Sequence, residues 1–221
     1  MRSYGQYCGL ARALDVVGDR WTLLIVRELL LTGSARYTDL LNGLPGIATN
    51  LLAERLRDLE EAGLVVREEA PPPVATALFR LTPRGQALEE VIAAFGRWAA
   101  PLMGEINPGD EVRPQWYLLP IRLYLRDASP DKPPMAIQLL MDGEPLLIET
   151  AGDGTLRSRP GSAESPDATL AGAPHVIMGL LAGRITLAQA RKRGLHFRGE
   201  HGALRRIARR HSASRPTGPG R

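Results

Sequence analysis

The chain has 221 residues, enough for one or two domains, and its 44% hydrophobic and 24% charged residues are typical of a water-soluble globular protein. A single cysteine excludes an intrachain disulfide framework. The sequence has neither a signal-like leader nor an apolar run of roughly 18 residues, so we expect a cytoplasmic protein with no membrane partner. The net charge is +4, yet residues 1–104 carry 11 Lys and Arg against 12 Asp and Glu, and residues 105–221 carry 17 against 12.

Two helices are predicted first. Residues 10–17 form a short helix that ends at Gly18, and residues 20–31 form a longer helix that ends at the sequence Thr32-Gly33-Ser34. Apolar residues lie on almost every side of the second helix, as expected for a central buried helix.

The next pattern is the most informative one in the chain. We expect a short helix over residues 38–44, a turn at Pro45-Gly46 and a long helix over residues 48–62, which Gly63 ends in a left-handed conformation. Three leucines share one face of the long helix: Leu52, Leu56 and Leu59. A β-hairpin of residues 64–69 and 78–81 follows, and Thr82-Pro83 begins another helix. This order is typical of a DNA-binding module with a β-wing.

Five motifs in this region resemble those of the HxlR family of bacterial winged-helix transcriptional regulators. They span residues 8 to about 104 and comprise Cys8–Gly18, Arg20–Leu30, Arg36–Leu40, Leu52–Val65 and Leu81–Gly85. One such motif would be a weak signal, whereas five in the same order are a strong one. The resemblance implies a winged helix-turn-helix fold, a homodimer and binding to double-stranded DNA.

The long helix contains the candidate base-reading residue. With its leucines facing inward, Asn50, Glu54 and Arg57 point outward and Ala53 lies beside them. Asn50 is in the first turn, where a recognition helix meets base edges, and its amide can pair with adenine; the alternative is a solvated residue at a helix start. Arg57 suits a phosphate contact, or an ion pair within its own helix.

Further residues are expected to position the DNA backbone. Thr38 caps its helix, where free N–H groups suit a phosphate, and Arg36 would reinforce that contact; a cap alone is the plainer interpretation of Thr38. Arg55 would pack its stem inward and offer its guanidinium to a phosphate. The full predicted DNA-binding set is Arg36, Thr38, Thr49, Asn50, Ala53, Arg55, Arg57, Arg67 and Arg80. The wing tip, residues 70–76, has no basic residue, so we expect the wing to contribute weakly.

Residues 82–103 are predicted to form one long helix with a continuous apolar stripe. We expect a dimer seam formed by Val91, Phe95, Trp98 and Leu102, because winged-helix dimers match two-fold operators; the alternative is packing on a second domain.

Cys8 is a candidate redox sensor, since some HxlR-type regulators carry a sensing thiol at this place. It lies just before a helix and four residues from Arg12, and both features favour a thiolate. The alternative is a small buried hydrophobic residue.

The pattern changes after a linker over residues 105–114. Residues 115–125 are apolar-rich and undecided between helix and strand because of Pro120. Thereafter we expect strands at 134–141, 144–150, 155–158, 167–170 and 195–198, helices at 174–181, 186–192 and 200–210, and a disordered basic tail at 211–221.

Residues 115–210 resemble the SCP2-like (sterol carrier protein 2-like) domain. The resemblance depends on element order and on Asp167–Gly172, Leu180–Ile185 and Leu195–Gly199. The chain is therefore expected to be α+β, with a winged helix-turn-helix domain at 1–104 and an SCP2-like α+β domain at 115–210. The resemblance implies an apolar tunnel for a lipid-like molecule.

These features predict a dimeric, sequence-specific transcriptional regulator, modulated by a hydrophobic small molecule or a partner at its C-terminal domain. The alternative is a lipid-like ligand carrier or interaction protein whose winged helix no longer reads DNA. We expect no enzyme, cofactor or metal: no nucleophile–base set occurs, and His175, His196, His201 and His211 lack zinc-ligand spacing.

Overall fold

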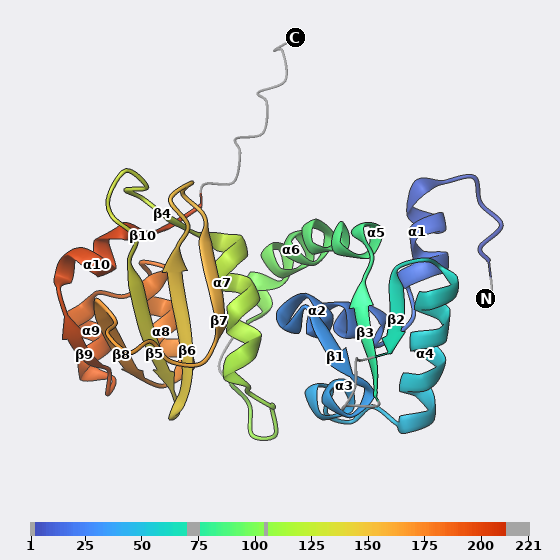
Figure 1. Cartoon of the computed structure of the whole chain (residues 1–221), viewed down its shortest axis with the longest axis horizontal. Helices are drawn as coiled ribbons and strands as arrows, with labels where there is room; N and C mark the ends of the chain where they lie inside the picture. Colours follow the sequence, from blue (N-terminus) through green and yellow to red (C-terminus); the bar gives the residue numbers. More distant parts are fainter. Residues whose placement is uncertain (1–2, 70–75, 104–105, 211–221) are drawn as a thin grey trace, which may run out of the picture. The chain divides into compact units, whose positions relative to one another are not determined.

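The computed structural model describes residues 3–69, 76–103 and 106–210 (Figure 1). The chain divides into two compact units, residues 1–111 and 112–221, which are considered in turn. Most of the predicted wing tip (residues 70–75) and the predicted disordered tail (residues 211–221) lie outside the described residues.

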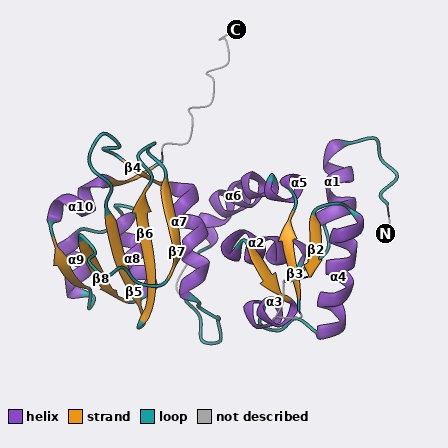
Figure 2. Ribbon diagram, in the orientation of Figure 1, coloured by secondary structure: helices purple, strands orange, loops and turns teal. Residues whose placement is uncertain are grey.

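The first unit combines helices with a small antiparallel sheet of strand order β1-β3-β2 (Figure 2). Its elements are α1 (Gly9–Val17), α2 (Thr22–Thr32), β1 (Ser34–Arg36), α3 (Tyr37–Gly43), α4 (Thr49–Glu61), β2 (Val65–Glu69), β3 (Ala77–Leu81), α5 (Pro83–Gln86), α6 (Leu88–Ala99) and a 3₁₀ turn (Ala100–Leu102). The predicted helix, turn, helix and hairpin are confirmed. Strand β1 was not predicted, and the single helix expected over 82–103 is divided into α5, α6 and the 3₁₀ turn.

The core of the first unit follows from the apolar patterns of α2 and α4. Ile25, Val26 and Leu29 of α2 are buried at its centre, although Leu24 on the same helix is 40% exposed, so α2 is not buried all round. The three leucines of α4 complete the core: Leu52, Leu56 and Leu59. Burying one such side chain stabilises the fold by about 1.5–3 kcal/mol, which fixes the opposite face of α4 toward the outside.

Two glycines allow the wing to follow α4 closely. Gly63 has φ +67°, a left-handed conformation that ends α4 as predicted, and the N–H of Leu64 donates to the carbonyl oxygen of Leu59 at 2.9 Å. Gly85 in α5 lies against the backbone of Leu64, where a Cβ atom would be 2.1 Å from the carbonyl oxygen. Only glycine fits there without moving β2 or α5.

The second unit is built on a five-stranded sheet of order β7-β6-β5-β8-β9, in which β5 and β8 run parallel and the other pairs are antiparallel. Its elements are a 3₁₀ turn (Pro114–Tyr117), α7 (Leu118–Tyr124), β4 (Leu125–Asp127), β5 (Ala136–Met141), β6 (Glu144–Thr150), β7 (Leu156–Pro160), β8 (Ala168–Gly172), α8 (Pro174–Leu181), α9 (Leu187–Lys192), β9 (His196–Gly199), α10 (His201–Arg206) and β10 (Ile207–Arg209). The undecided segment 115–125 is thus mainly helical, with Pro120 in the first turn of α7, where its missing N–H costs no hydrogen bond.

One face of the sheet carries the apolar core of the second unit. Ile137, Leu139 and Leu170 on adjacent strands are fully buried, and α8 packs against β5 and β8. Ser158 Oγ on β7 donates to the carbonyl oxygen of Leu118 on α7, which holds that helix at the other end of the same face. On the opposite face, Gln138 is buried and accepts from the N–H of Ala163.

The second unit is closed by segments from its beginning and its end. The helix predicted over 200–210 stops at Arg206, and residues 207–209 form β10, which pairs with β4. The guanidinium of Arg206 binds both carboxylate oxygens of Asp127, at 3.1 and 2.6 Å, and donates to the carbonyl oxygen of Pro133. The helix ends here because Ile207 is extended and residues 207–209 pair with β4, and the bidentate bond to the fully buried Asp127 side chain fixes Arg206 at this junction.

Candidate nucleic-acid interface

The outer face of α4 carries Asn50, which the sequence analysis placed against base edges, together with its neighbours on that face. Thr49, Asn50, Glu54 and Arg57 are exposed, and Ala53 is half-buried beside them. Because the leucines on the other side of α4 are buried, this face is held rigidly toward solvent. The structure therefore brings Thr49, Asn50, Ala53 and Arg57 together on one helix face, as an element that enters a major groove requires.

The start of α4 is held by α3 and has no side-chain cap. The hydroxyl of Tyr37, the first residue of α3, donates to the carbonyl oxygen of Thr49, the first residue of α4, at 2.5 Å. Ala48 occupies the cap position, and its methyl side chain cannot accept a hydrogen bond from the first N–H groups of α4. The first turn of α4 also holds no acidic residue. Sequence reasoning missed Tyr37, because nothing local indicates a partner 12 residues further on.

The prediction that Thr38 caps its helix is wrong. The helix α3 begins at Tyr37, and Arg36 occupies the cap position with extended backbone angles. The carboxylate of Asp39 accepts the N–H of Arg36 at 3.0 Å, so that the helix begins one residue early. Thr38 is instead an exposed residue in the first turn of α3, with Arg36 exposed just before it.

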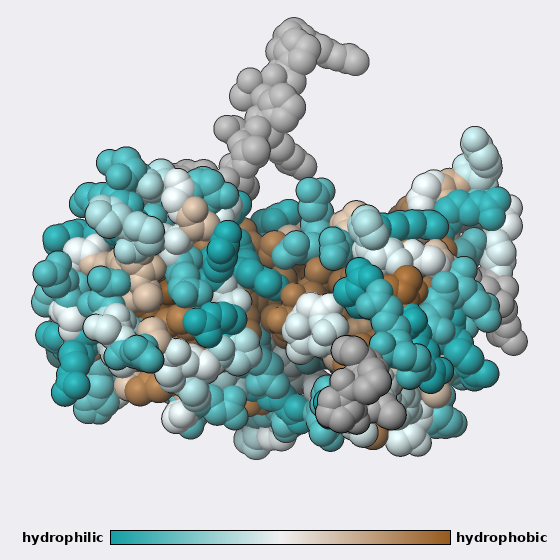
Figure 3. Space-filling view, viewed as in Figure 1, coloured by the Kyte–Doolittle hydropathy of each residue, from teal (hydrophilic) through white to brown (hydrophobic). Residues whose placement is uncertain are grey.

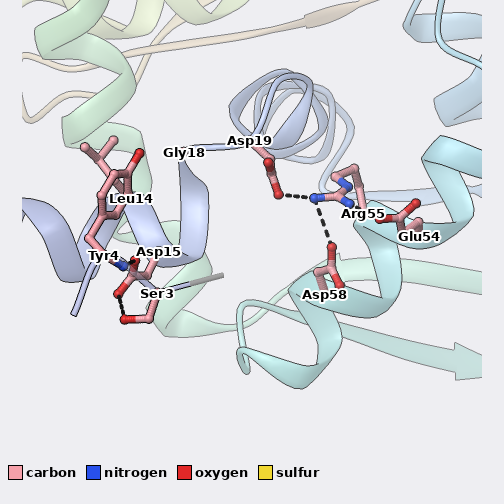
Figure 4. A pocket seen from close by; sticks show the side chains of 9 residues that line it. All are labelled: Ser3, Tyr4, Leu14, Asp15, Gly18, Asp19, Glu54, Arg55 and Asp58. Atoms are coloured by element: carbon pink, nitrogen blue, oxygen red, sulfur yellow. Dashed lines mark hydrogen bonds and ion pairs between the residues drawn. The ribbon is translucent and has the colours of Figure 1, made fainter. Parts of the chain in front are cut away.

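The expected phosphate contact of Arg55 is also contradicted. Its side chain is only 11% exposed, and its guanidinium binds the carboxylates of Asp19, Glu54 and Asp58, the last at 3.1 Å. These four residues line one part of a surface pocket of about 600 Å³, and Ser3, Tyr4, Leu14, Asp15 and Gly18 line the rest (Figure 4). Four of the nine lining residues are acidic, so the pocket repels a phosphate. The i, i+3 spacing to Asp58 was a signal of this role, whereas Asp19 is 36 residues away.

The wing arginines are partly neutralised by their neighbours. Arg80 on β3 binds Glu68 on β2, which lowers the pKa of the Glu68 carboxyl group and raises the pKa of Arg80. Arg67 lies 3.7 Å from Glu69 and is 58% exposed. The unpredicted strand β1 pairs Ser34 with Arg80, which places Arg36 and Arg80 on the same face of the small sheet.

Helix α6 and the 3₁₀ turn that follows it present an exposed apolar strip, which we call the α6 strip: Val91, Phe95, Trp98 and Leu102. Phe95 is 52% exposed and Trp98 is 72% exposed, and Figure 3 shows apolar side chains gathered over α6. The stripe predicted over 82–103 is not one surface, however, because Leu88 and Ile92 pack against the core of the first unit. An exposed apolar strip of this kind usually marks an interface.

Cys8 is exposed at the start of α1, directly before Gly9. The backbone N–H groups of Ala11 and then Leu10 stabilise the thiolate and lower the pKa of the Cys8 thiol. The thiol is therefore not a buried hydrophobic residue, and the helix start, rather than Arg12, accounts for the lowered pKa.

The described residues offer no alternative centre of metal chemistry. No group of three His, Cys, Asp or Glu side chains within them is placed to hold a metal ion, and His175, His196 and His201 are exposed. His211 lies outside the described part. Across the same residues, no helix combines the length and the apolar character needed to cross a membrane.

Comparison with known proteins concerns mainly the first half of the chain. Residues 16–107 match the family described as HxlR-like helix-turn-helix. The chain is 35% identical over 88 residues to the HTH-type transcriptional regulator YvaP of Bacillus subtilis, covering 40% of this chain and 81% of YvaP. It is 33% identical over 100 residues to YodB of the same organism, covering 45% of this chain and 86% of YodB. It is 37% identical over 114 residues to Rv3095 of Mycobacterium tuberculosis, covering 52% of this chain and 65% of Rv3095.

Among solved structures, the reduced form of YodB from B. subtilis is similar to this chain. The sequences are 31% identical, the alignment covers 48% of this chain and all of that chain, and the TM-score is 0.40. The family match ends at residue 107, before the second unit begins.

Proposed function

Because the chain belongs to the HxlR family of helix-turn-helix transcriptional regulators, we propose that it is a dimeric, sequence-specific regulator in which α4 reads double-stranded DNA. The observation that carries this proposal is the outer face of α4, where exposed polar residues project from a helix whose other face is locked by buried leucines. Asn50 pairs with an adenine edge, Thr49 and Ala53 flank it, and Arg57 contacts a phosphate. Thr38 and Arg36 approach the backbone from α3.

Dimerisation is proposed to occur through the α6 strip. Its four exposed apolar side chains would be covered by the same strip of a second copy, and a two-fold dimer matches a two-fold operator. The two α4 helices would then be separated by a distance that the dimer geometry sets. Any ligand that changes this geometry changes DNA affinity.

The second unit is proposed to be an SCP2-like sensor for a hydrophobic small molecule or a docking partner. Support comes from the motif resemblance and from a mixed sheet whose one face is apolar and covered by α7 and α8. The test is uptake of an apolar fluorescent dye by the full chain and its displacement by lipid-like compounds. If the dye emits no more strongly with the protein than without it, the second unit does not take up apolar molecules, and only the role of docking a partner remains.

One observation favours a second candidate function. Arg55, Arg67 and Arg80 are all engaged by carboxylates, and the charges of residues 1–104 nearly cancel. This suits a lipid-like ligand carrier or interaction protein whose winged helix no longer reads DNA.

A gel shift on the DNA upstream of the protein's own gene separates the two functions. Specific binding that weakens steeply as salt increases supports the regulator, because phosphate contacts release counterions. No retained fragment at low salt, together with dye uptake, supports the carrier. Sequencing the genomic fragments that the protein retains then identifies the operator.

A further inference from the structure

The second unit concentrates positive charge in its last elements. Between residues 184 and 210 the sequence has nine Lys and Arg residues and one acidic residue, Glu200. Arg206 is committed to Asp127, and Nε of Arg210 donates to the carbonyl oxygen of Leu125. The other seven cationic side chains are exposed.

Five of these side chains form what we call the cationic cluster: Arg191, Lys192, Arg193, Arg198 and Arg205. They come from α9 and the turn after it, from β9, which is the edge strand of the sheet, and from α10. The rings of Phe197 and His201 lie 5.3 Å apart, which holds the start of α10 against β9. Figure 1 shows α9, β9 and α10 together at one end of the second unit, and Figure 3 shows many hydrophilic side chains at that end on the face in view.

The cluster is not explained by pairing within the protein. In the described part of the chain, none of its five members has a carboxylate within salt-bridge distance. Arg191 and Lys192 lie in the last turn of α9 and Arg193 directly follows it, where all three offset the helix dipole. This does not account for Arg198 and Arg205 on neighbouring elements. Like charges gathered without partners cost free energy unless a polyanion neutralises them.

We infer that the cationic cluster binds the phosphate backbone of DNA and adds sequence-independent affinity to the site that α4 reads. The inference rests on the proposed function, because the first unit selects the DNA. It meets a need of that unit, because residues 1–104 carry 11 basic against 12 acidic residues and so have no excess positive charge for phosphates. Since both units belong to one chain, DNA held by α4 is at a high local concentration for the cluster.

The composition of the surface favours duplex DNA over other polyanions. Stable docking on an anionic membrane surface takes exposed large apolar side chains in addition to basic residues, and single-stranded nucleic acid is held by exposed aromatic rings. Within the described residues, the exposed large hydrophobic side chains all lie between Tyr4 and Val112, so 184–210 has none. Arginine, which supplies four of the five charges, suits phosphate oxygens.

The test compares two charge-matched variants of the full chain on a mixed-sequence duplex of roughly 40 base pairs, long enough for several phosphate contacts. The first variant is Arg191→Gln, Arg198→Gln and Arg205→Gln. The control is Lys132→Gln, Arg157→Gln and Arg159→Gln, which removes three exposed charges elsewhere in the same unit. Circular dichroism verifies that both remain folded.

The dissociation constant is measured over a series of salt concentrations. Log affinity falls as log salt rises, and each lost phosphate contact makes this slope less steep by about 0.9. We therefore expect the magnitude of the slope to decrease by about 2–3 for the cluster variant and by less than about 1 for the control. Equal slopes for the two variants, with the unaltered chain binding normally, would overturn the inference. The inference would also be overturned if the cluster variant bound DNA like the unaltered chain and lost only its binding to phosphatidylserine vesicles. If the unaltered chain does not bind DNA at all, the proposed function fails first and the inference with it.

Discussion

The hydroxyl of Tyr37 holds the carbonyl oxygen of Thr49 at 2.5 Å, so the first residue of α3 fixes the first residue of α4 across the intervening turn. A hydrogen bond of this kind contributes about 0.5–1.5 kcal/mol. Tyr37→Phe should lower the free energy of unfolding by that amount in urea denaturation and weaken specific DNA binding. Tyr7→Phe is the matched control, since Tyr7 is fully exposed, and it should change neither quantity. A Tyr37→Phe protein as stable as the unaltered one would show that the bond does not position α4.

Asn50 is predicted to read a base. Asn50→Ala should cost about 1–3 kcal/mol on the operator and little on random DNA, because a bidentate base contact exists only at the correct sequence. Arg57→Ala should weaken binding to both DNAs, since a phosphate is present in either. Fluorescence anisotropy on the two duplexes measures this. Equal losses for Asn50→Ala on both duplexes would assign Asn50 to the backbone.

The α6 strip is predicted to be a dimer seam. Phe95→Glu places a charge in the middle of the strip and should give a folded monomer, because a buried unpaired carboxylate is costly. Arg97→Glu, on another side of the same helix, should leave the dimer intact. Light scattering with multi-angle detection gives the mass of each protein. A Phe95→Glu protein that still has the mass of a dimer would place the seam elsewhere.

The buried ion pair of the second unit should dominate its response to acid. Asp127→Ala leaves Arg206 unpaired and should cost about 3–5 kcal/mol, whereas Arg159→Ala, which breaks an exposed pair with Glu149, should cost at most about 1 kcal/mol. Arg206 lowers the pKa of Asp127 in the folded state, so its stabilisation is complete above the unfolded value of about 3.9 and is lost as the pH falls through the folded pKa. Denaturation curves should therefore show the cost of Asp127→Ala shrinking below about pH 4. A cost that does not change with pH would mean that packing, not charge, is lost.

Cys8 should react as an activated thiol. Because N–H groups at the start of α1 stabilise the thiolate, the midpoint of its alkylation rate against pH should lie below the value of about 8.5 for a free thiol. In urea, where α1 is unfolded, the midpoint should return to that value. If Cys8 is the sensor, oxidant should reduce DNA binding by the unaltered chain but not by Cys8→Ser. Identical midpoints in buffer and in urea would remove the basis for sensing.

The elements that the sequence could predict are those with a local pattern. The leucine stripe of α4, the stop at Gly63 and the hairpin around Asp142-Gly143 each depend on residues a few positions apart. These elements were predicted correctly because side-chain periodicity and turn residues indicate the buried face and the ends of an element without knowledge of the rest of the fold.

The elements that could not be predicted are created by distant partners. Strands β1 and β10 have three residues each and exist only through pairing with β3 and β4. Arg55 was assigned to a DNA phosphate because it lies at the border of the buried leucine stripe of its own helix. Its guanidinium instead binds the carboxylate of Asp19, 36 residues earlier, which no local pattern indicates. The candidate base-reading face was predictable for the opposite reason: its exposure follows from the leucine stripe on the other side of α4, and Thr49, Asn50 and Arg57 are exposed as that stripe implies.

The pairing of β4 with β10 has a consequence for synthesis on the ribosome. Asp127 meets its partner Arg206 only after 79 more residues have been made, while every element of the first unit is complete by residue 102. Domains generally fold as units, beginning from the N-terminus. The DNA-reading unit can therefore fold while the second unit still waits with an unpaired strand and an uncompensated carboxylate. A nascent chain halted before Arg206 would expose that strand edge, so we expect this interval to be the one in which the second unit is most open to pairing with strands of other chains.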